Sequence, residues 1–252
     1  MAKQSGIIKL EGLLGDISFY KTSEGFKVRE KGGVSAKRIA NDPAFQRTRE
    51  NNAEFGQAGK SSKILRNALQ LVVQKAKDKY MTSRLTTAML AVVKTDTQHT
   101  RGQRMAANGN LQLLRNFEFN SNGKLDAALL VLYALEVNRT AGEVQLALEE
   151  YQPNSLIVPP AGTTHYQISL ALAEVDLTAG TFVFAMKQTE VLPYNATNVA
   201  AETLTAAITP ETTLPVFVVL GVEFFQEVNG AMYSLKNGSY NALKLIAVDE
   251  VS

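Results

Sequence analysis

The stretch Leu214-Pro215-Val216-Phe217-Val218-Val219-Leu220-Gly221-Val222-Glu223-Phe224-Phe225 decides how the second half of this chain folds. It is the longest apolar stretch, and its β-branched and aromatic residues predict a strand over residues 216–225. It contains Glu223 and is far shorter than the roughly 20 apolar residues that a membrane-spanning helix needs. We therefore expect a soluble protein without a membrane partner.

Similar runs recur on both sides of this stretch, and turn signals such as Pro159-Pro160 and Asn229-Gly230 separate them. The other predicted strands span residues 129–137, 144–148, 155–158, 166–172, 181–186, 232–235 and 242–248. About eight strands at this spacing predict an antiparallel β-sandwich of immunoglobulin-like or jelly-roll type. The chain has no Trp and no Cys, so the disulfide and tryptophan core of antibody domains is excluded.

The residues before this β-rich region have helical periodicity. Asp42 is a plausible N-cap, and Pro43 fits the first helical position. Apolar residues keep helical spacing over residues 61–76 and again over 82–93, and a shorter helical stretch is expected between 101 and 115.

Short strands are expected at the N-terminus, over residues 7–10, 17–20 and 26–29, followed by a polar arm that reaches Asp42. In the third strand Phe26 and Val28 alternate with Lys27 and Arg29, which predicts one apolar and one basic face. The predicted class is α+β in three regions: a basic strand pair and arm (1–42), a helical region (43–120) and an acidic β-sandwich domain (121–252).

The charge is divided between the two halves of the chain. Residues 1–120 contain 21 bases and 10 acids, a net charge of +11, whereas residues 121–252 contain 5 bases and 14 acids, a net charge of −9. The total of +2 conceals this division. Such asymmetry favours a partner of opposite charge: nucleic acid, an acidic surface or another copy of the chain.

The motifs that carry catalytic chemistry are missing. Gly56-Gln57-Ala58-Gly59-Lys60-Ser61 resembles a phosphate-binding loop, but its glycine spacing is two residues short, Glu54 stands where the first glycine belongs, and a polar helical run precedes it. We interpret it as a glycine break between two helices. His99 and His165 lie in different regions, and adjacent Glu149 and Glu150 would point to opposite faces of a strand. We expect no enzyme, no cofactor, no metal site and no small-molecule substrate.

The strongest candidate site is a segment of bases with aromatic residues nearby. Its candidate contact residues are Phe19, Tyr20, Phe26, Lys27, Arg29, Lys31, Lys37, Arg38, Arg47 and Arg49. Bases and aromatics of this kind bind phosphates and stack on nucleobases. They equally suit docking onto the acidic half of a neighbouring copy, where charge steers the encounter and apolar contacts add affinity.

Three N-terminal motifs resemble a family of uncharacterised proteins from Bacteroidetes-type bacteria. They are Gly15-Asp16-Ile17-Ser18-Phe19-Tyr20-Lys21, Arg29-Glu30-Lys31-Gly32-Gly33 and Arg47-Thr48-Arg49-Glu50-Asn51-Asn52-Ala53-Glu54-Phe55-Gly56. The resemblance implies a strand pair, a basic arm, a helical middle and a β-rich C-terminal half. It implies no activity, cofactor or catalytic residue.

The leading hypothesis is a non-enzymatic structural protein that self-assembles through residues 7–50 into a filament, ring or shell. Its strands would add to a sheet edge of a neighbour, head to tail. The alternative is nucleic-acid binding by the basic half. Lys9 and Glu11 interrupt any apolar run of a signal peptide, which favours a cytoplasmic protein. Export by a machine that needs no cleaved N-terminal signal stays open as an alternative, and a component of a virion or of an injection machine also fits the structural class.

Overall fold

The computed structural model describes residues 2–30 and 32–251, and it divides the chain into two compact units, up to Glu50 and from Asn51 onward. The expected regions differ from this division. The boundary at 120/121 does not separate compact units, because the helices before it and the strands after it share a core. Lys31 lies outside the described residues.

The first unit contains a four-stranded antiparallel sheet with the order β1-β4-β3-β2. Its strands are β1 (Ala2–Lys3), β2 (Gly12–Leu14), β3 (Ile17–Thr22) and β4 (Gly25–Glu30). A two-residue turn joins β2 to β3, and Gly15 supplies the positive φ of 58° that such hairpin turns require.

Two predictions for the N-terminus are wrong in detail. Residues 7–10 form no strand, because the Gln4 side chain bonds both backbone groups of Leu10 (2.9 and 3.1 Å) and so takes the place of a strand partner. The expected arm contains a short helix, α1 (Ala36–Asn41), which Ser35 caps.

The helix start predicted at Asp42 is confirmed. The Asp42 carboxylate accepts a hydrogen bond from the Ala44 N–H (3.0 Å) at the start of η1 (Pro43–Phe45), and α2 (Gln46–Ala68) follows directly. Because α2 is continuous, the glycine break expected near Gly56 does not occur. Next come α3 (Gln70–Val73) and α4 (Met81–Lys94), then short turns at η2 (Ala106–Asn108) and η3 (Leu111–Leu114) in place of the expected third helix.

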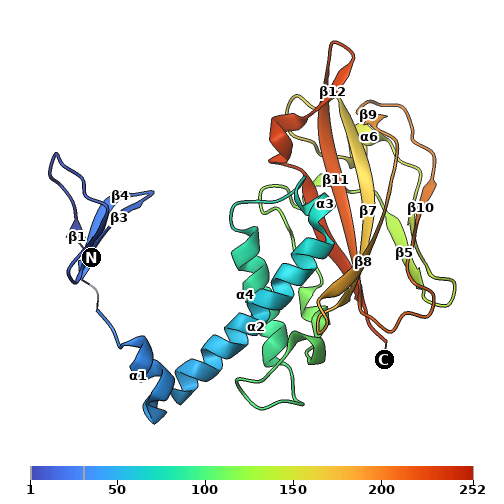
Figure 1. Cartoon of the computed structure of the whole chain (residues 1–252). Helices are drawn as coiled ribbons and strands as arrows, with labels where there is room; N and C mark the ends of the chain where they lie inside the picture. Colours follow the sequence, from blue (N-terminus) through green and yellow to red (C-terminus); the bar gives the residue numbers. More distant parts are fainter. Residues whose placement is uncertain (1, 31, 252) are drawn as a thin grey trace. The chain divides into compact units, whose positions relative to one another are not determined.

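The second unit is built around a six-stranded antiparallel sheet and a three-stranded one (Figure 1). The large sheet contains β7 (His165–Asp176), β8 (Thr181–Gln188), β9 (Leu192–Pro193), β11 (Val216–Val228), β12 (Ala231–Ser234) and β13 (Ala242–Asp249). The small sheet has the order β10-β6-β5 and contains β5 (Tyr133–Asn138), β6 (Glu143–Leu148) and β10 (Glu202–Ala207). The predicted α+β class with an antiparallel β-sandwich is confirmed.

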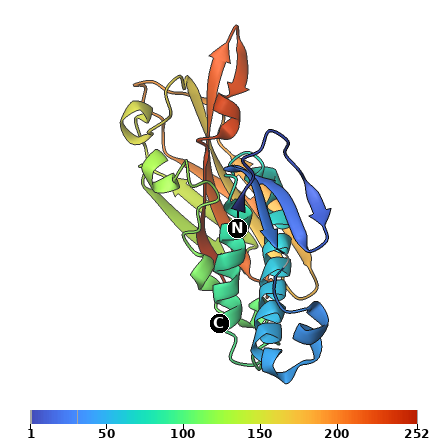
Figure 2. The ribbon, with the colours of Figure 1, turned by 90° about the vertical axis from the view of Figure 1, so that its left-hand side faces the viewer.

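Strand β11 is central because both of its faces are buried. Val218 and Leu220 point to the small sheet, whereas Phe217 and Val219 belong to a second core shared with the helices. All residues from Val216 to Phe224 are buried. Figures 1 and 2 show α2 and α4 along one face of the large sheet, so this unit has three layers: helices, large sheet and small sheet.

The remaining differences occur in weakly patterned segments. Residues 155–158 do not form the expected strand, because Pro153 starts a short helix, α6 (Pro153–Leu156). Strands β9 and β10 were not predicted. In β10 only Leu204 and Ala206 are buried, and they alternate with the exposed residues Thr203, Thr205 and Ala207, which leaves a weak apolar signal. Another four-residue helix, α5 (Leu125–Ala128), leads into β5.

Candidate functional site

The register of the N-terminal sheet sorts its residues onto two unlike faces. Residues that are directly opposite in an antiparallel pair share a face, and neighbours along a strand alternate. The face that we call the apolar face carries Leu14, Ile17, Phe19, Lys21, Phe26, Val28 and Glu30. The opposite face, the basic face, carries Lys3, Leu13, Tyr20, Lys27 and Arg29.

The apolar face has no second layer within its own unit. None of the described residues between Ala2 and Glu50 is buried. Leu14 is 68% exposed and Ile17 is 41% exposed, although both lie on the apolar face. Sheets in stable domains bury their apolar face against another layer. This unit therefore lacks the core that a fold of this size needs for stability.

The charges of the apolar face lie at its two ends. Lys21 is opposite Phe26 beside the β3–β4 turn, and its Nζ lies 5.5 Å from the centre of the Phe26 ring. Glu30 lies opposite Ile17 at the other end of the same strands. Four residues at about 3.3 Å each place the two charges roughly 13 Å apart.

The structure separates the predicted site residues rather than gathering them. Phe19 and Phe26 lie on the apolar face, while Tyr20, Lys27 and Arg29 lie on the basic face, where the Arg29 guanidinium is 5.6 Å from the Tyr20 ring centre. The interleaved bases and aromatics of the sequence thus become two distinct surfaces. Leu14, Lys21 and Glu30 were missed as site residues, although the alternation along β3 carries the same signal as that along β4.

The remaining predicted bases belong to the helical part of this unit. Lys37 and Arg38 lie on α1, and Arg38 forms an ion pair with Asp42 (3.0 Å). Arg47 and Arg49 lie in the first turn of α2. The Arg49 guanidinium donates to backbone carbonyls of Ile39 (2.7 Å) and Asp42 (2.9 Å), so Arg49 holds α1 against α2.

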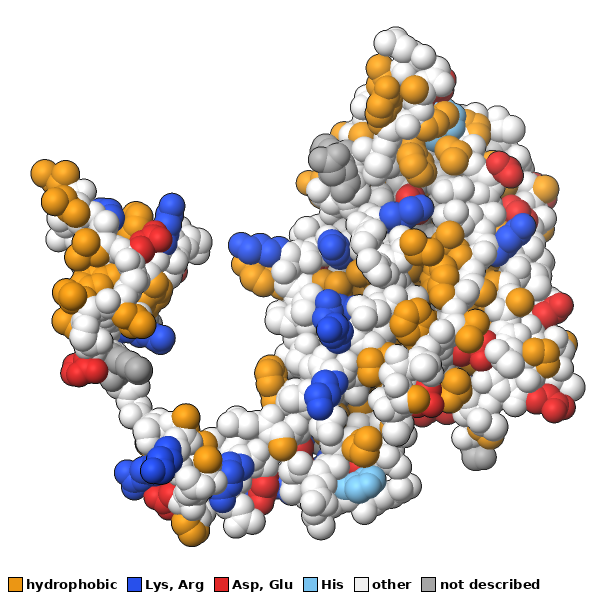
Figure 3. All heavy atoms as spheres, in the orientation of Figure 1, with side chains coloured by type: hydrophobic (Ala, Val, Ile, Leu, Met, Phe, Trp, Pro, Cys, Tyr) orange, Lys and Arg blue, Asp and Glu red, His pale blue; other side chains and the backbone are white. Residues whose placement is uncertain are grey.

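Most of the charge division lies inside the second unit. Residues 1–50 carry a net charge of +4, residues 51–120 carry +7 and residues 121–252 carry −9. In Figure 3, Lys and Arg side chains line the helical layer, and Asp and Glu side chains gather on the opposite side of the same unit. The strands of the small sheet carry Glu136, Glu143 and Glu202 and no Lys or Arg.

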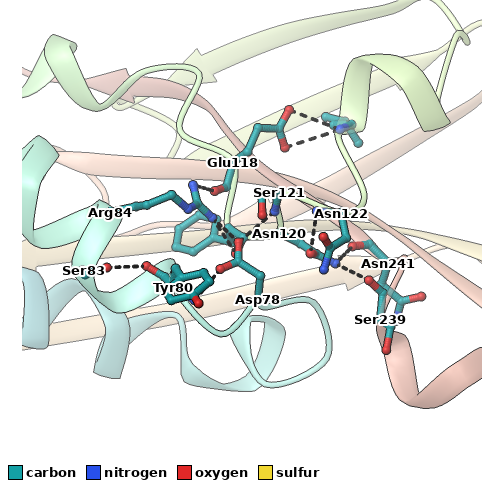
Figure 4. Close-up of polar contacts among 12 residues, drawn as sticks. Asp78, Tyr80, Ser83, Arg84, Glu118, Asn120, Ser121, Asn122, Ser239 and Asn241 are labelled. Carbon is teal, nitrogen blue, oxygen red and sulfur yellow. Dashed lines mark hydrogen bonds and ion pairs between the residues drawn. The ribbon is translucent and has the colours of Figure 1, made fainter. Parts of the chain in front are cut away.

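A polar network joins the helical layer to the sheets (Figure 4). The Asp78 carboxylate pairs with Arg84 and accepts hydrogen bonds from the N–H groups of Tyr80 (2.6 Å) and Ser121 (2.8 Å). These bonds outweigh burial, which opposes ionisation, and lower the pKa of Asp78 to about 2. Asn120, itself buried, donates to the carbonyl of Asn241 (2.8 Å). Since its groups already bond one another, we interpret this network as structural.

Glu118 lies in the same network in an unusual electrostatic state. Burial is the main cause that raises the pKa of Glu118 to about 7. The hydrogen bond from the Leu125 N–H (3.2 Å) and the nearby charge of Lys244 lower this pKa, but by less than burial raises it. Lys244 is itself paired with Asp126 (2.6 Å). Glu118 therefore changes protonation near neutral pH.

Other buried carboxylates also act as structural anchors. Asp96 pairs with His99 (2.8 Å) and accepts hydrogen bonds from three backbone N–H groups, which fix the loop after α4. Glu54 accepts one from the Gly102 N–H (2.9 Å). His165 begins β7, far along the chain from His99.

The described ranges contain no group of three or more His, Cys, Asp or Glu that could hold a metal ion. In the same ranges no helix is both long enough and apolar enough to cross a membrane. Gly56, Gly59 and Lys60, from the sequence that resembles a phosphate-binding loop, lie within α2, where the backbone N–H groups are used by the helix.

Comparisons with known proteins yield little. No family model matches the chain, and no curated protein matches it. Among solved structures, one described as "pH-induced modulation of Streptococcus parasanguinis adhesion by Fap1 fimbriae" matches with 9% identity and a TM-score of 0.26, over 52% of this chain and 88% of that one. A likeness this weak carries no argument about fold or function.

Proposed function

We propose that this chain is a non-enzymatic structural protein that assembles with copies of itself through its N-terminal unit. The observation that carries the proposal is an apolar sheet face in a unit without one buried residue among those described. Burying apolar surface stabilises a fold by roughly 25 cal/mol per Å². A second copy that covers this face supplies the missing core.

The arrangement that fits the face best is a pair of identical sheets packed face to face. Stacked sheets lie about 10 Å apart with their side chains interdigitated. A two-fold axis across the strands brings Lys21 of one copy to Glu30 of the other, twice. Residues 1–30 contain five bases and four acids, so little net repulsion opposes this contact.

A contact of this kind is closed and gives a dimer. The filament, ring or shell expected from the sequence needs a second contact. For that contact the second unit offers surfaces of opposite sign, the basic helical layer and the acidic small sheet. Complementary charge aligns the two surfaces of such a head-to-tail contact and speeds their association.

Adjacent residues in β2 give a matched test of the apolar face. Leu14 lies on the apolar face and Leu13 on the basic face, with exposed fractions of 68% and 73%. Sedimentation velocity of the full chain should show that Leu14→Asp weakens self-association about tenfold or more, while Leu13→Asp leaves it nearly unchanged. Equal effects of the two variants, or a wild type that stays monomeric at every concentration, would contradict the proposal.

Charge exchange tests the two-fold arrangement. Lys21→Glu and Glu30→Lys should each weaken association, because each variant brings like charges together. An equimolar mixture of the two variants restores both attractive pairs and should associate like the wild type. If the mixture associates no more strongly than either variant alone, the face-to-face arrangement is ruled out.

The alternative proposal, nucleic-acid binding, is favoured by one observation: residues 51–120 carry a net charge of +7, which includes exposed bases on α2 and α4 such as Lys60 and Lys94. It predicts DNA or RNA affinity that falls steeply with salt. A gel-shift assay at low salt tests this alternative. If neither DNA nor RNA is shifted, the alternative is wrong. Lys60→Glu, which reverses an exposed base of α2, should weaken this binding. Within the basic N-terminal segment, Arg47→Glu is a better probe than Arg49→Glu, because Arg49 also bonds backbone carbonyls.

A further inference from the structure

A polar hollow lies between the end of α2, α3 and the start of α4. Its volume of about 370 Å³ falls in the range of small-molecule sites. Side chains that can donate hydrogen bonds dominate its lining: Arg66, Asn67, Gln70, Gln74, Lys77 and Lys79. All of them belong to the second unit, so the hollow is independent of the N-terminal sheet.

The cations of this hollow have no carboxylate partner among the described residues. Asp78 is its one acidic lining residue, and its carboxylate is already bonded to Arg84 and to two backbone N–H groups. Lys79 lies 5.6 Å from the Tyr80 ring centre, a contact that leaves its N–H donors available. The hollow therefore has a positive potential that its own side chains do not neutralise.

Arg66 is the lining side chain whose shape suits a phosphate best. Its Nε is shielded from solvent and, like the Nε atoms of Arg84 and Arg104, has no hydrogen-bond partner within the described structure, but the residue as a whole is only partly buried and lines the hollow. An anion in the hollow would accept from the terminal nitrogens of this guanidinium, whose planar array of donors matches phosphate oxygens.

We infer that this hollow binds a phosphate group, as carried by a small oligophosphate. Arg66 would be the central ligand, with Lys77 and Lys79 on the rim and the amides of Gln70 and Gln74 as neutral donors. This site differs from the glycine and lysine sequence at residues 56–61, which lies within a helix and presents no free backbone donors.

The test is isothermal titration calorimetry of the full chain with tripolyphosphate at low ionic strength. Acetate is the control for binding that needs only a negatively charged ligand. Arg66→Gln should weaken tripolyphosphate binding about tenfold to a hundredfold, the range for a charged hydrogen bond. Lys63→Gln is the matched control: it removes an exposed cation from the same helix outside the hollow. If Arg66→Gln does not fold, Lys77→Gln replaces it as the test. This variant changes an exposed residue of the hollow and should also weaken tripolyphosphate binding.

The possible results distinguish a specific phosphate-binding site from non-specific electrostatic attraction. Selective loss in Arg66→Gln or Lys77→Gln, with binding retained in Lys63→Gln, supports the inference. It is overturned by no binding of tripolyphosphate, by equal binding of acetate, or by equal losses in all three variants. A single-stranded oligonucleotide that competes with tripolyphosphate, and fails to do so in the Arg66→Gln variant, would identify a nucleic-acid backbone as the source of the phosphate.

Discussion

Replacing Glu118 by Gln should change how the stability of this protein depends on pH. Burial raises the pKa of Glu118 to about 7 in the folded state, against an ordinary value of 4.5. Below pH 4.5 the carboxyl is protonated in both the folded and the unfolded chain, so it does not lower the free energy of unfolding. Between pH 4.5 and 7 only the unfolded chain releases the proton, so the stability of the wild type falls as the pH rises, and above pH 7 the whole penalty is present.

The size of this effect follows from the difference between the two pKa values. At 1.36 kcal/mol per unit the upper limit is about 3.4 kcal/mol, and the half-buried position of Glu118 reduces the expectation to about 2 kcal/mol. Glutamine keeps an oxygen that can accept from the Leu125 N–H without carrying a charge. Glu118→Gln should therefore be about 2 kcal/mol more stable than the wild type at pH 8 and nearly equal to it at pH 4.

Urea denaturation followed by circular dichroism suits this measurement, because the chain has no Trp. Glu136→Gln, which removes an exposed carboxylate from β5, controls for the change in net charge. If Glu118→Gln and the wild type differ by the same amount at pH 4 and pH 8, the assignment of a buried, costly charge to Glu118 is wrong.

Two further substitutions test structural anchors in the second unit. Asp96→Ala should destabilise the protein by about 3 kcal/mol, since it leaves the Met105 N–H and His99 without an acceptor, and hydrogen exchange should show the loop after α4 opening. Because the pKa of Asp96 is lowered to about 2, the stability that its carboxylate contributes should be present above pH 4 and lost in the wild type as the pH falls towards 2. Gly123→Ala would place a Cβ 2.4 Å from the Tyr240 carbonyl oxygen, so its melting temperature should fall by several degrees. An unchanged melting temperature would contradict this packing.

The parts of the fold that the sequence predicts well are those with one dominant local pattern. Residues 216–225 are apolar apart from Glu223 because β11 is buried on both faces, and α4 keeps its apolar stripe because it covers the large sheet. The helix start at Asp42 was predictable because a cap and a proline act locally.

Other features depend on contacts that no local pattern contains. The strand expected at residues 7–10 is prevented by the side chain of Gln4. The shared core of helices and sheet joins Leu65 to Phe217, two residues far apart in the chain. The apolar face could be assembled only after the register showed that Ile17 lies opposite Glu30 and Leu14.

The charge division illustrates the same limit. Counting residues shows that the two halves of the chain differ in sign, but not that most of the excess positive charge belongs to a helical layer packed on its own sheet. The N-terminal unit is therefore distinguished less by its charge than by an apolar face that no layer of its own covers. This shifts the expected contact from the basic residues to residues such as Leu14 and Phe19.

The most direct test of self-assembly is the mass of the full chain in solution, measured by light scattering over a range of concentrations at low and high salt. A single chain has a mass of 27.4 kDa. We predict that the mass rises to at least twice this value as the concentration increases, and that the increase persists at high salt because an apolar contact drives it. A mass of one chain under every condition would contradict the account.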